Sequence, residues 1–534
     1  MHRRIPTRRR WLRRYRRSTL VNGNVCRARP SRHDIDLPAR SRAADLTKGS
    51  IIDTQWLDAT TQAELVRTGE VAPRELVQDA IERIDRLDPV LNAVNHRRFG
   101  AALAESETVD ASAPFAGVPT LIKGLTAMEG DPNDRGTLVL KDFGSTAKSD
   151  AVIARRFREA GFIVVGRSAA PELGIVSTTE SKAHGITRNP WRLDLTSGGS
   201  SGGAATAVAA GMVPAAHGGD GGGSIRMPAA FCHLVGLKPS RGLISTGPAT
   251  ADRWGHSVPG VLTRTVRDTA GIVDAVSGGE PGDQGRPALI EGGLLGALKR
   301  APTRLRIGFV TCPAGLSAPV DAEVSDAVLD AARLLESLGH TVDSSYPDTM
   351  FDPRNIRAFF DSLSVTVAQS IDAIEVEVGR ALAFDELDVI SRHWERRGRE
   401  MSGVDLADSL NWLGGLRSRM GNWWASGFDL LLSPVFATTP PKLSWPWSEP
   451  GGVEKTIDVL TFTAPINSTG QPAISVPYGF TSAGEPLAVQ LVAAFGRDDL
   501  LISTAAQIES ARPWVHMTPA VADRANFDAE GAGA

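Results

Sequence analysis

Two glycine-rich clusters, separated by a short run of small residues, constrain this sequence more than any other feature. The first cluster is residues 198–203 (GGSSGG), the second is residues 218–224 (GGDGGGS), and residues 204–210 between them are small and helix-prone. Glycine adopts backbone torsions that other residues avoid, so both clusters can form loops whose N–H groups face a bound oxygen. A serine ending such a loop can attack a carbonyl group while the N–H groups stabilise the developing oxyanion. The clusters therefore predict a site for nucleophilic catalysis.

Three other interpretations of the clusters stay open at this point. A phosphate-binding loop has a lysine directly after its last glycine, and neither cluster is followed by one. Residues 198–202 satisfy the G-x-S-x-G pattern of the α/β-hydrolase nucleophile elbow, which follows a hydrophobic strand, whereas residues 189–194 (NPWRLD) are mostly polar. A glycine-rich turn with a purely structural role does not require serines at these positions. The serines thus favour the catalytic interpretation.

Segments typical of strands and of helices alternate along the chain, which predicts an α/β fold with a mixed sheet. From Pro73 onward, apolar residues recur at helical spacing as far as Leu87, and proline suits a first helical turn. Residues 350–430 are expected to be mostly helical. The other expected strands are residues 162–166, 305–310, 340–342, 429–434 and 473–477, and the other expected helices are residues 151–160 and 321–338.

Composition limits the class of protein. Of the 534 residues, 42% are hydrophobic and 22% are charged, which is ordinary for a globular protein. No stretch of 18 apolar residues occurs, so no membrane-spanning helix is expected. The three cysteines, Cys26, Cys232 and Cys312, are scattered and odd in number, which excludes a disulfide framework and a cysteine zinc cluster. A cytoplasmic location, where thiols stay reduced, fits this pattern best.

Charge divides the chain into a basic N-terminal segment and an acidic remainder. Residues 1–43 contain 14 arginines and two acidic residues, and the remaining residues carry a net formal charge of about −15. The main domain is therefore not expected to bind nucleic acid, since phosphate binding needs a basic surface. Residues 7–13 resemble the start of a twin-arginine export signal, but the apolar segment that such a signal requires does not follow. We expect residues 1–49 to be a disordered extension, with a targeting segment or a binding tail as alternatives, residues 50–515 to form one large domain, and residues 516–534 to be a C-terminal tail.

The sequence around the clusters resembles the amidase signature family, hydrolases that use a Ser–cis-Ser–Lys triad. The family pattern G-G-S-S-G-G followed by G-x-D-x-G-G-S-I-R-x-P-A matches residues 198–203 and 218–229. The other matching segments are the lysine segment 117–123, Glu172, residues 189–191, residues 236–242 and residues 467–472. The resemblance extends over residues 55–512, so the domain of residues 50–515 is expected to be an amidase domain. The form GGDGGGSIR is similar to that of the branch containing 6-aminohexanoate cyclic-dimer hydrolase.

The resemblance implies an amidase-signature fold, with a central twisted mixed β-sheet flanked by helices on both faces, and it implies no metal or organic cofactor. Ser224 would be the acylated nucleophile and Lys123 the base. Ser200 would bridge the two, preceded by a cis peptide bond. The supporting residues that the resemblance implies are the oxyanion-hole donors Gly221, Gly222 and Gly223, the hydrogen-bonding Ser201, and the bracing pair Asp220 and Arg226.

The chemistry of the matched residues is consistent with these roles. A serine hydroxyl becomes a good nucleophile when a neighbouring base removes its proton. A lysine acts as a base only when it is neutral, burial favours the neutral form, and Lys123 ends an apolar segment. Three residues depart from the family pattern: Gly124 where aspartate is common, Gly221 where threonine is common, and His233 where a small residue is usual. None of them removes a catalytic group, so the departures bear on specificity.

Histidines and tryptophans near the clusters are expected to have structural roles. His217, His233 and His256 show no H-x-x-x-H metal spacing, so no metal site is expected. Cys232, in an apolar run, is expected in the core. The tryptophans of residues 423–424 and 445–447 are also expected there, with pocket lining as the alternative.

We therefore expect an enzyme that hydrolyses a linear or cyclic carboxamide to a carboxylate and an amine or ammonia through a seryl acyl-enzyme. The expected partner is a small-molecule amide, no membrane is expected to be involved, and a homodimer stays open. Two alternatives remain. The A subunit of a tRNA-dependent glutamine amidotransferase uses the same chemistry, and a non-catalytic binding protein could share the fold, although intact Lys123, Ser200 and Ser224 argue against the latter. The substrate pocket is expected within residues 350–460.

Overall fold

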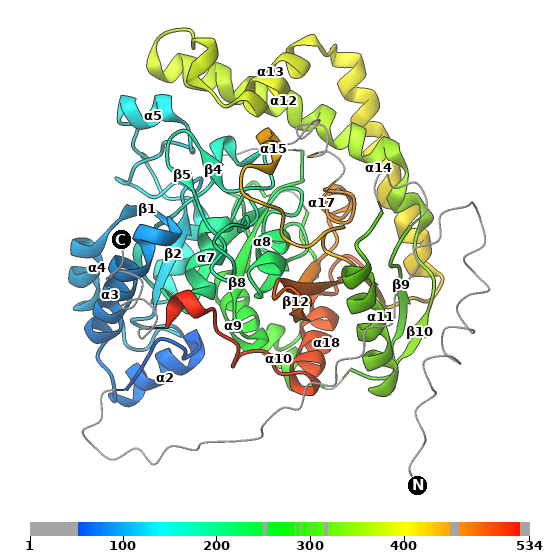
Figure 1. Cartoon of the computed structure of the whole chain (residues 1–534), viewed down its shortest axis with the longest axis horizontal. Helices are drawn as coiled ribbons and strands as arrows, with labels where there is room; N and C mark the ends of the chain where they lie inside the picture. The colour runs from blue at the N-terminus through cyan, green and yellow to red at the C-terminus, as the bar shows by residue number, and fades with distance from the viewer. Residues whose placement is uncertain are drawn as a thin grey trace.

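An eleven-stranded sheet forms the centre of the structure (Figure 1). The computed structural model describes residues 52–248, 254–283, 285–288, 290–300, 302–313, 319–448, 456 and 459–523. In sheet order the strands are β1 (Val94–Arg97), β3 (Ile163–Ser168), β2 (Pro119–Lys123), β6 (Ala215–Asp220), β8 (Val258–Thr263), β7 (Val235–Lys238), β12 (Ala473–Phe480), β13 (Pro486–Ala493), β11 (Leu430–Ser433), β9 (Arg306–Phe309) and β10 (Thr341–Asp343). A separate two-stranded ribbon joins β4 (Glu180–Ser181) to β5 (Gly185–Ile186).

The sheet is mixed, as the sequence pattern predicted. β2 pairs in parallel with β3 and β6, and β9 pairs in parallel with β10 and β11, whereas the other neighbouring strands are antiparallel. The expected strands at residues 162–166, 305–310, 429–434 and 473–477 correspond to β3, β9, β11 and β12. The sequence pattern did not predict β1, β2, β6, β7, β8 or β13 as strands, and β8 and β13 pack inside the sheet.

Helices cover both faces of the sheet, which confirms the predicted layers. One face carries α3 (Pro73–Leu91), α7 (Gly202–Ala209) and α8 (Arg226–Phe231), and the other carries α6 (Val152–Glu159), α9 (Val266–Val276), α11 (Ala322–Ser337) and α18 (Asp498–Ala511). Successive strand residues point to opposite faces. Accordingly, Leu121 of β2 belongs to the core of the first group of helices, and Ile122 belongs to the core of the second.

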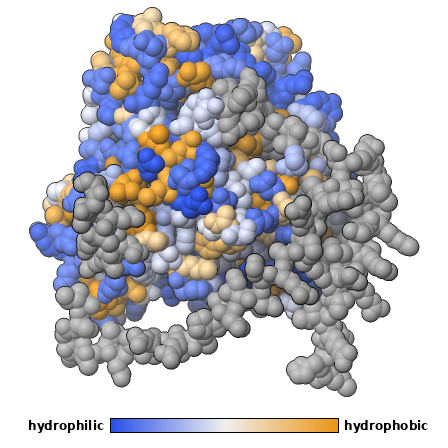
Figure 2. Space-filling view, viewed as in Figure 1, coloured by the Kyte–Doolittle hydropathy of each residue, from blue (hydrophilic) through white to orange (hydrophobic). Residues whose placement is uncertain are grey.

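A third group of helices arches over the top and the right side of the view in Figure 1: α12 (Pro353–Val378), α13 (Val389–Glu400) and α14 (Gly403–Ala425). They account for most of the region that was expected to be helical. α12 packs on α13 through the stacked rings of Phe360 and Trp394, 4.5 Å apart. The outer surface of this layer is mixed, with hydrophobic residues scattered among hydrophilic ones over α12 and α13 in Figure 2. Its core includes Leu173 and Val176, so the layer covers the loop that follows β3.

Two of the expected segments lie wholly or partly outside the described residues. The basic extension, residues 1–49, is outside them, and the C-terminal tail is described only as far as residue 523. There η4 (Ala520–Ala522) packs on the body of the protein, with Ala522 2% exposed and its carbonyl accepting from Arg86 Nη1 at 3.4 Å. Within the described part of the chain, none of the helices has both the length and the apolar character needed to cross a membrane.

Candidate active site

Lys123 and the two glycine clusters meet at one edge of the sheet. Lys123 is the last residue of β2, and Asp220 is the last residue of β6. Because β2 and β6 are parallel neighbours, their carboxyl ends lie side by side, at the edge where ligands bind in open α/β sheets. Ser200 and Ser201 reach the same place, since they directly precede α7, which packs on both strands.

The side chain of Lys123 is buried and hydrogen-bonded to both clusters. Its Nζ donates to the Oγ atoms of Ser200 and Ser201, each at 2.8 Å, and to the carbonyl oxygen of Gly219 at 3.2 Å. Lys123 is 3% exposed, so these protein groups take the place of solvent around the amine. The lysine amine is thereby held within proton-transfer distance of the Ser200 hydroxyl.

His217 fixes the backbone at Lys123. Its Nδ1 accepts a hydrogen bond from the Lys123 N–H at 3.3 Å, and Phe157 packs edge-on against its ring. Burial, and then the charge of Lys123, lower the pKa of His217 to about 3. The ring is therefore neutral near pH 7 and able to accept at Nδ1, which agrees with the structural role expected for His217.

The peptide bond between Gly199 and Ser200 is cis, the geometry that the resemblance implied. Gly199 packs directly against the backbone of Thr178, and a Cβ added to Gly199 would lie 2.2 Å from the Thr178 carbonyl oxygen. Only glycine fits at this contact. The first cluster is thus anchored at Gly199 on one side and at Lys123 on the other.

Ser224 borders a pocket with about 620 Å³ of empty space, its open mouth included. The described lining residues are Gly174, Ile175, Val176, Ser177, Gly221, Gly222, Ser224, Met227, Trp254, His256, Phe359, Phe360, Leu363, Thr366, Thr456 and Leu460. Gly174 also packs against Ser200, since a Cβ added to Gly174 would lie 3.3 Å from Ser200 Oγ. The pocket therefore connects Ser224 with the surroundings of Ser200. Its described lining contains no Asp, Glu, Lys or Arg, and part of it comes from α12, within the expected region 350–460.

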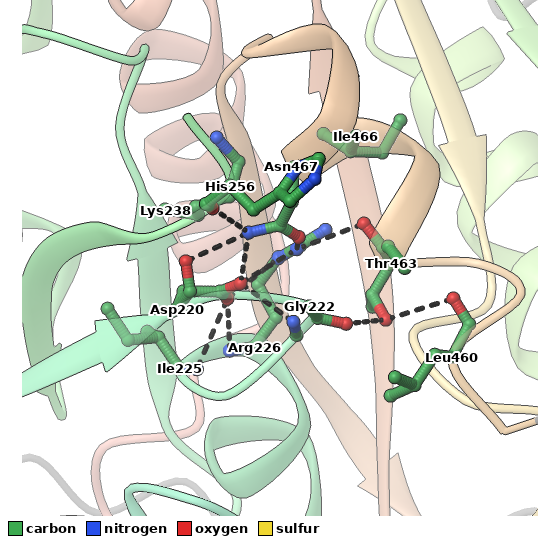
Figure 3. Close-up of polar contacts among 12 residues, drawn as sticks. Asp220, Gly222, Ile225, Arg226, Lys238, His256, Leu460, Thr463, Ile466 and Asn467 are labelled. Carbon is green, nitrogen blue, oxygen red and sulfur yellow. Dashed lines mark hydrogen bonds and ion pairs between the residues drawn. The ribbon is translucent and has the colours of Figure 1, made fainter. Parts of the chain in front are cut away.

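A buried ion pair fastens the second cluster to α8 (Figure 3). Asp220 Oδ1 and Arg226 Nη2 lie 3.0 Å apart, and both side chains are fully buried. Asn467 of α17 (Ala464–Thr469) donates to the Asp220 carbonyl at 2.8 Å and accepts from Arg226 Nη2 at 2.5 Å. Burial disfavours the Asp220 carboxylate, but the Arg226 charge and the hydrogen bonds outweigh this and hold the pKa of Asp220 well below its ordinary value. The pair therefore stays ionised and braces the loop.

The same network determines which N–H groups of the second cluster are available. The Gly223 N–H donates to Asp220 Oδ1 at 2.7 Å, and the Gly222 carbonyl accepts from Thr463 Oγ1 at 2.5 Å. The N–H that was expected from Gly223 for the oxyanion hole is therefore already bonded to a carboxylate. Gly221 and Gly222 line the pocket, so the geometry favours these two residues over Gly223 for that role.

The tryptophan of the pocket wall is not one of those singled out in the sequence. Trp254 lines the pocket, and its Nε1 donates to Thr366 Oγ1 at 3.2 Å. In contrast, Trp423 stacks on Phe428 with ring centroids 4.3 Å apart, away from the described lining. Trp254 stands in no motif, so only the folded chain brings it to the site.

The three histidines have different surroundings. His256 borders the pocket, so the expectation of a purely structural role does not fully describe it. His233 stacks on Phe480, with ring centroids 4.4 Å apart, outside the described lining. No group of three or more His, Cys, Asp or Glu side chains in the described ranges is arranged to hold a metal ion. Cys232 is fully buried, as expected of a core cysteine, and burial raises the pKa of its thiol.

Comparison with known proteins agrees with the motif analysis. A family model described as Amidase matches residues 75–502. The chain is 39% identical over 478 residues to 6-aminohexanoate-cyclic-dimer hydrolase of Paenarthrobacter ureafaciens, covering 87% of this chain and 96% of the relative. It is 34% identical over 486 residues to an acylamidase of Rhodococcus erythropolis, covering 87% of this chain and 97% of the relative.

The fold agrees as well. A solved structure of 6-aminohexanoate cyclic dimer hydrolase complexed with substrate superposes with a TM-score of 0.84 at 37% identity, covering 88% of this chain and 100% of that chain. The resemblance identified from residues 198–203 and 218–229, including its branch, is thus confirmed.

Proposed function

This chain belongs to the amidase family, and on that premise we propose that it hydrolyses its carboxamide substrate through an acyl-enzyme on Ser224, with Ser200 and Lys123 as the proton relay. The observation that carries this proposal is the pair of 2.8 Å hydrogen bonds from Lys123 Nζ to the hydroxyl groups of Ser200 and Ser201. Both glycine clusters thereby converge on one buried amine, beside the pocket that Ser224 lines.

In the acylation step, Ser224 Oγ attacks the amide carbonyl carbon. Its proton moves to Ser200 as the Ser200 proton moves to neutral Lys123, so that the nucleophile is activated as its bond to carbon forms. The backbone N–H groups of Gly221 and Gly222 stabilise the oxyanion of the tetrahedral intermediate. The C–N bond then breaks, and the proton returns through the relay to the leaving nitrogen.

In the deacylation step, water attacks the ester carbonyl carbon of the acyl-enzyme. The relay removes one proton from the water and returns it to Ser224 as the C–O bond breaks, which regenerates the enzyme and leaves a carboxylic acid. The acid releases its proton to solvent and departs as the carboxylate. Ser201 holds the Lys123 amine, while the Asp220–Arg226 pair holds the loop that carries Ser224. These residues position the relay and do not react.

We propose that the substrate is uncharged. The described lining residues include no Asp, Glu, Lys or Arg, and burial lowers the pKa of His256 to about 3, so that ring is neutral near pH 7. Burying a charged group in such a pocket without a partner is costly. Free glutamine carries two charged groups, which argues against the amidotransferase alternative. Because the chain is similar to a cyclic-dimer hydrolase, we propose that the substrate is either a cyclic or a linear amide.

We also propose a cytoplasmic location, because the buried Cys232 is a free thiol and the three cysteines are scattered and odd in number. No nucleic-acid partner is proposed for the main domain, given its acidic net charge. Association into a homodimer stays a prediction that sedimentation can test.

The test of the catalytic proposal combines labelling with turnover. A fluorophosphonate probe should add one mass equivalent to the protein, and peptide mapping should place it on Ser224. Ammonia or amine release should be measured from neutral aliphatic, aromatic and cyclic amides and from glutamine. Labelling at another residue, or release from glutamine alone, would overturn the proposal.

A further inference from the structure

The peptide unit between Gly222 and Gly223 is held at both of its polar ends. Its carbonyl, that of Gly222, accepts from Thr463 Oγ1 at 2.5 Å (Figure 3), and its N–H, that of Gly223, donates to Asp220 Oδ1 at 2.7 Å. Thr463 and Asp220 are both fully buried. These two hydrogen bonds therefore fix one peptide plane in the loop that ends at Ser224.

This plane is free to turn unless it is held, because glycine lies on both sides of it. Glycine has no Cβ, so both orientations of the peptide are sterically allowed. In the other orientation the Gly222 carbonyl oxygen would point away from Thr463. Gly222 lines the described pocket and Thr463 does not, so that direction is the pocket side of the loop. A carbonyl oxygen there would repel the oxyanion that the neighbouring N–H groups stabilise.

Thr463 directs its hydroxyl group to this carbonyl and not to its own helix. It is the N-cap residue of α17, and an N-cap threonine ordinarily accepts from an N–H group of the first helical turn. Thr463 makes no such bond. Its Oγ1 also lies 3.3 Å from the Leu460 carbonyl, but that carbonyl already accepts from the Thr463 N–H at 3.0 Å. The single hydroxyl proton is therefore used on Gly222, at the shorter distance.

Thr463 is itself held in place by the residues that brace the second cluster. Arg226 Nη2 donates to the Thr463 carbonyl at 3.2 Å, and Asn467 Nδ2 donates to the Asp220 carbonyl at 2.8 Å. The packing is close as well, since a Cβ added to Gly223 would lie 2.6 Å from Thr463 Oγ1. The first turn of α17 and the second cluster thus form one packed unit, although 241 positions separate the two hydrogen-bonded residues.

We propose that Thr463 is a positioning residue of the hydrolysis: its hydroxyl group holds the Gly222 carbonyl out of the pocket, which leaves the N–H groups of Gly221 and Gly222 to the oxyanion. Thr463 acts only through the backbone, because it does not belong to the described lining. This inference rests on the proposed function, since the oxyanion forms when Ser224 attacks. It predicts an effect on the tetrahedral intermediate and none on the binding of an unreacted carbonyl compound.

The experiment compares two uncharged ketones, pentyl trifluoromethyl ketone and pentyl methyl ketone. Ser224 Oγ adds to the electrophilic carbonyl carbon of the first, its proton passes to the relay, and the carbonyl oxygen becomes an oxyanion. The second ketone has a much less electrophilic carbonyl group and binds without forming this adduct. Their inhibition constants are measured against hydrolysis of p-nitrophenyl hexanoate. Fluorine NMR detects the adduct, which the Ser224→Ala protein should lack.

Thr463→Val keeps the shape of the side chain and removes the donor. We expect it to weaken binding of the trifluoromethyl ketone by about 10-fold to 100-fold, which is less than the effect of deleting an oxyanion-hole donor outright, and to lower kcat on the ester by a similar factor. Its affinity for the methyl ketone should change by less than about two-fold. Thr463→Ser keeps the hydroxyl group and should restore the affinity for the trifluoromethyl ketone to within about three-fold of wild type.

Thr469→Val is the matched control. Thr469 lies on the same helix and is also buried, but its Oγ1 donates to Gln471 Oε1 at 2.7 Å and not to the second cluster. This variant should change neither inhibition constant by more than about two-fold. An equal loss of affinity for both ketones in Thr463→Val would indicate a general packing defect and would overturn the proposal. An unchanged affinity for the trifluoromethyl ketone would also overturn it.

A second variant covers the case in which Thr463→Val does not fold. Thr463→Cys has a thiol of similar size that is only a weak donor, so it should weaken binding of the trifluoromethyl ketone alone, by about three-fold or more. Unchanged binding in that variant would overturn the proposal.

The same measurements separate this inference from the proposed function. If wild type forms the adduct on Ser224 and Thr463→Val binds both ketones as wild type does, only the positioning role of Thr463 is wrong. If wild type hydrolyses amides but forms no adduct that Ser224→Ala lacks, the proposed function fails, and the role of Thr463 fails with it.

Discussion

The Nζ atom of Lys123 lies 2.8 Å from the hydroxyl oxygen of Ser200, although the two residues are 77 positions apart in the chain. β2 brings the lysine, and the loop before α7 brings the serine, to the same edge of the sheet. If this amine is the base of the relay, Lys123→Met should lower kcat on amides by about 10³-fold or more. Steady-state kinetics checks this, with circular dichroism to confirm folding.

A second buried lysine provides the matched control for that variant. Lys238 on β7 is fully buried, and its Nζ donates to the Pro239 carbonyl at 2.9 Å. Burial, and then the charge of Arg226, lower the pKa of Lys238 to about 7. Lys238→Met also removes a buried amine, yet kcat should stay within about ten-fold of wild type because Lys238 does not line the described pocket. If kcat fell equally in both variants, the loss in Lys123→Met would reflect packing and not the role of Lys123 as the base.

The contact between Gly199 and Thr178 should make Gly199 intolerant of any side chain. A Cβ at Gly199 would lie 2.2 Å from the Thr178 carbonyl oxygen, and no side-chain rotation can relieve this, because the backbone fixes the positions of both atoms. Gly199→Ala should therefore abolish amide turnover or folding. Gly219→Ala is the control, because a Cβ at Gly219 meets nothing within 4 Å. Amide turnover and thermal melting of the two proteins test this prediction. A folded and active Gly199→Ala protein would contradict the predicted clash with Thr178.

The sequence was most informative where the site is made of contiguous residues. Lys123, Ser200 and Ser224 stand in motifs, because backbone loops and strand ends that must approach one another closely leave a local pattern of glycines. The pocket wall leaves no such pattern. Trp254 and Phe359 reach it through side-chain packing between segments about a hundred residues apart, and that packing depends on the whole fold.

The same difference applies to the N–H group of Gly223. A run of three glycines predicts available N–H groups, but which of them faces the pocket depends on the acceptors nearby. Asp220 accepts from Gly223, and Thr463, from a distant segment, fixes the preceding carbonyl. Strands β8 and β13 were missed for a related reason, since buried strands carry no alternation of polar and apolar residues.

The Asp220–Arg226 ion pair should be essential for stability. Asp220→Asn leaves the Arg226 charge fully buried without its partner, which should lower the free energy of unfolding by about 3–5 kcal/mol. Urea unfolding at pH 7 measures this. Adding Arg226→Met removes the orphaned charge, so the double variant should be less destabilised than the sum of the two single variants.

The pH dependence of that loss follows from the pKa of Asp220, which is lower in the folded protein than in the unfolded chain. The stabilisation by the carboxylate is complete above the unfolded pKa of about 4 and is lost as the pH falls toward the folded value. The difference in the free energy of unfolding between wild type and Asp220→Asn should therefore become smaller below about pH 4. A difference that grows on acidification would contradict the assignment of an ionised Asp220.

Glu172 should show the opposite dependence. Its Oε1 accepts from the Asp388 N–H at 2.8 Å, and burial, followed by the Asp388 charge, raises the pKa of Glu172 to about 7. The folded protein then binds a proton that the unfolded chain has released, so stability falls as the pH rises from about 4.5 to about 7. Glu172→Gln keeps the acceptor without the charge and should stabilise the protein by about 1–3 kcal/mol at pH 8, and by little at pH 4.5. Thermal melting at both pH values tests this, and a variant destabilised at pH 8 would contradict it.

Ser224 and Ser200 should fail in different ways, because only one of them forms a bond to the substrate. Ser224→Ala removes the attacking atom, so no acyl adduct should form with any amide or ester. Ser200→Ala keeps the nucleophile and interrupts the path to Lys123, so activated esters, which need less help from an acid and a base, should still acylate the protein while amide turnover falls by about 10³-fold or more. The double variant should be barely worse than Ser224→Ala, since members of a relay act as a unit. Intact-mass spectrometry with an activated ester, beside steady-state amide kinetics, measures both effects. Acyl mass gained by Ser224→Ala, with Ser200 the first site to map because of its G-x-S-x-G setting, would mean that the roles of the two serines are reversed.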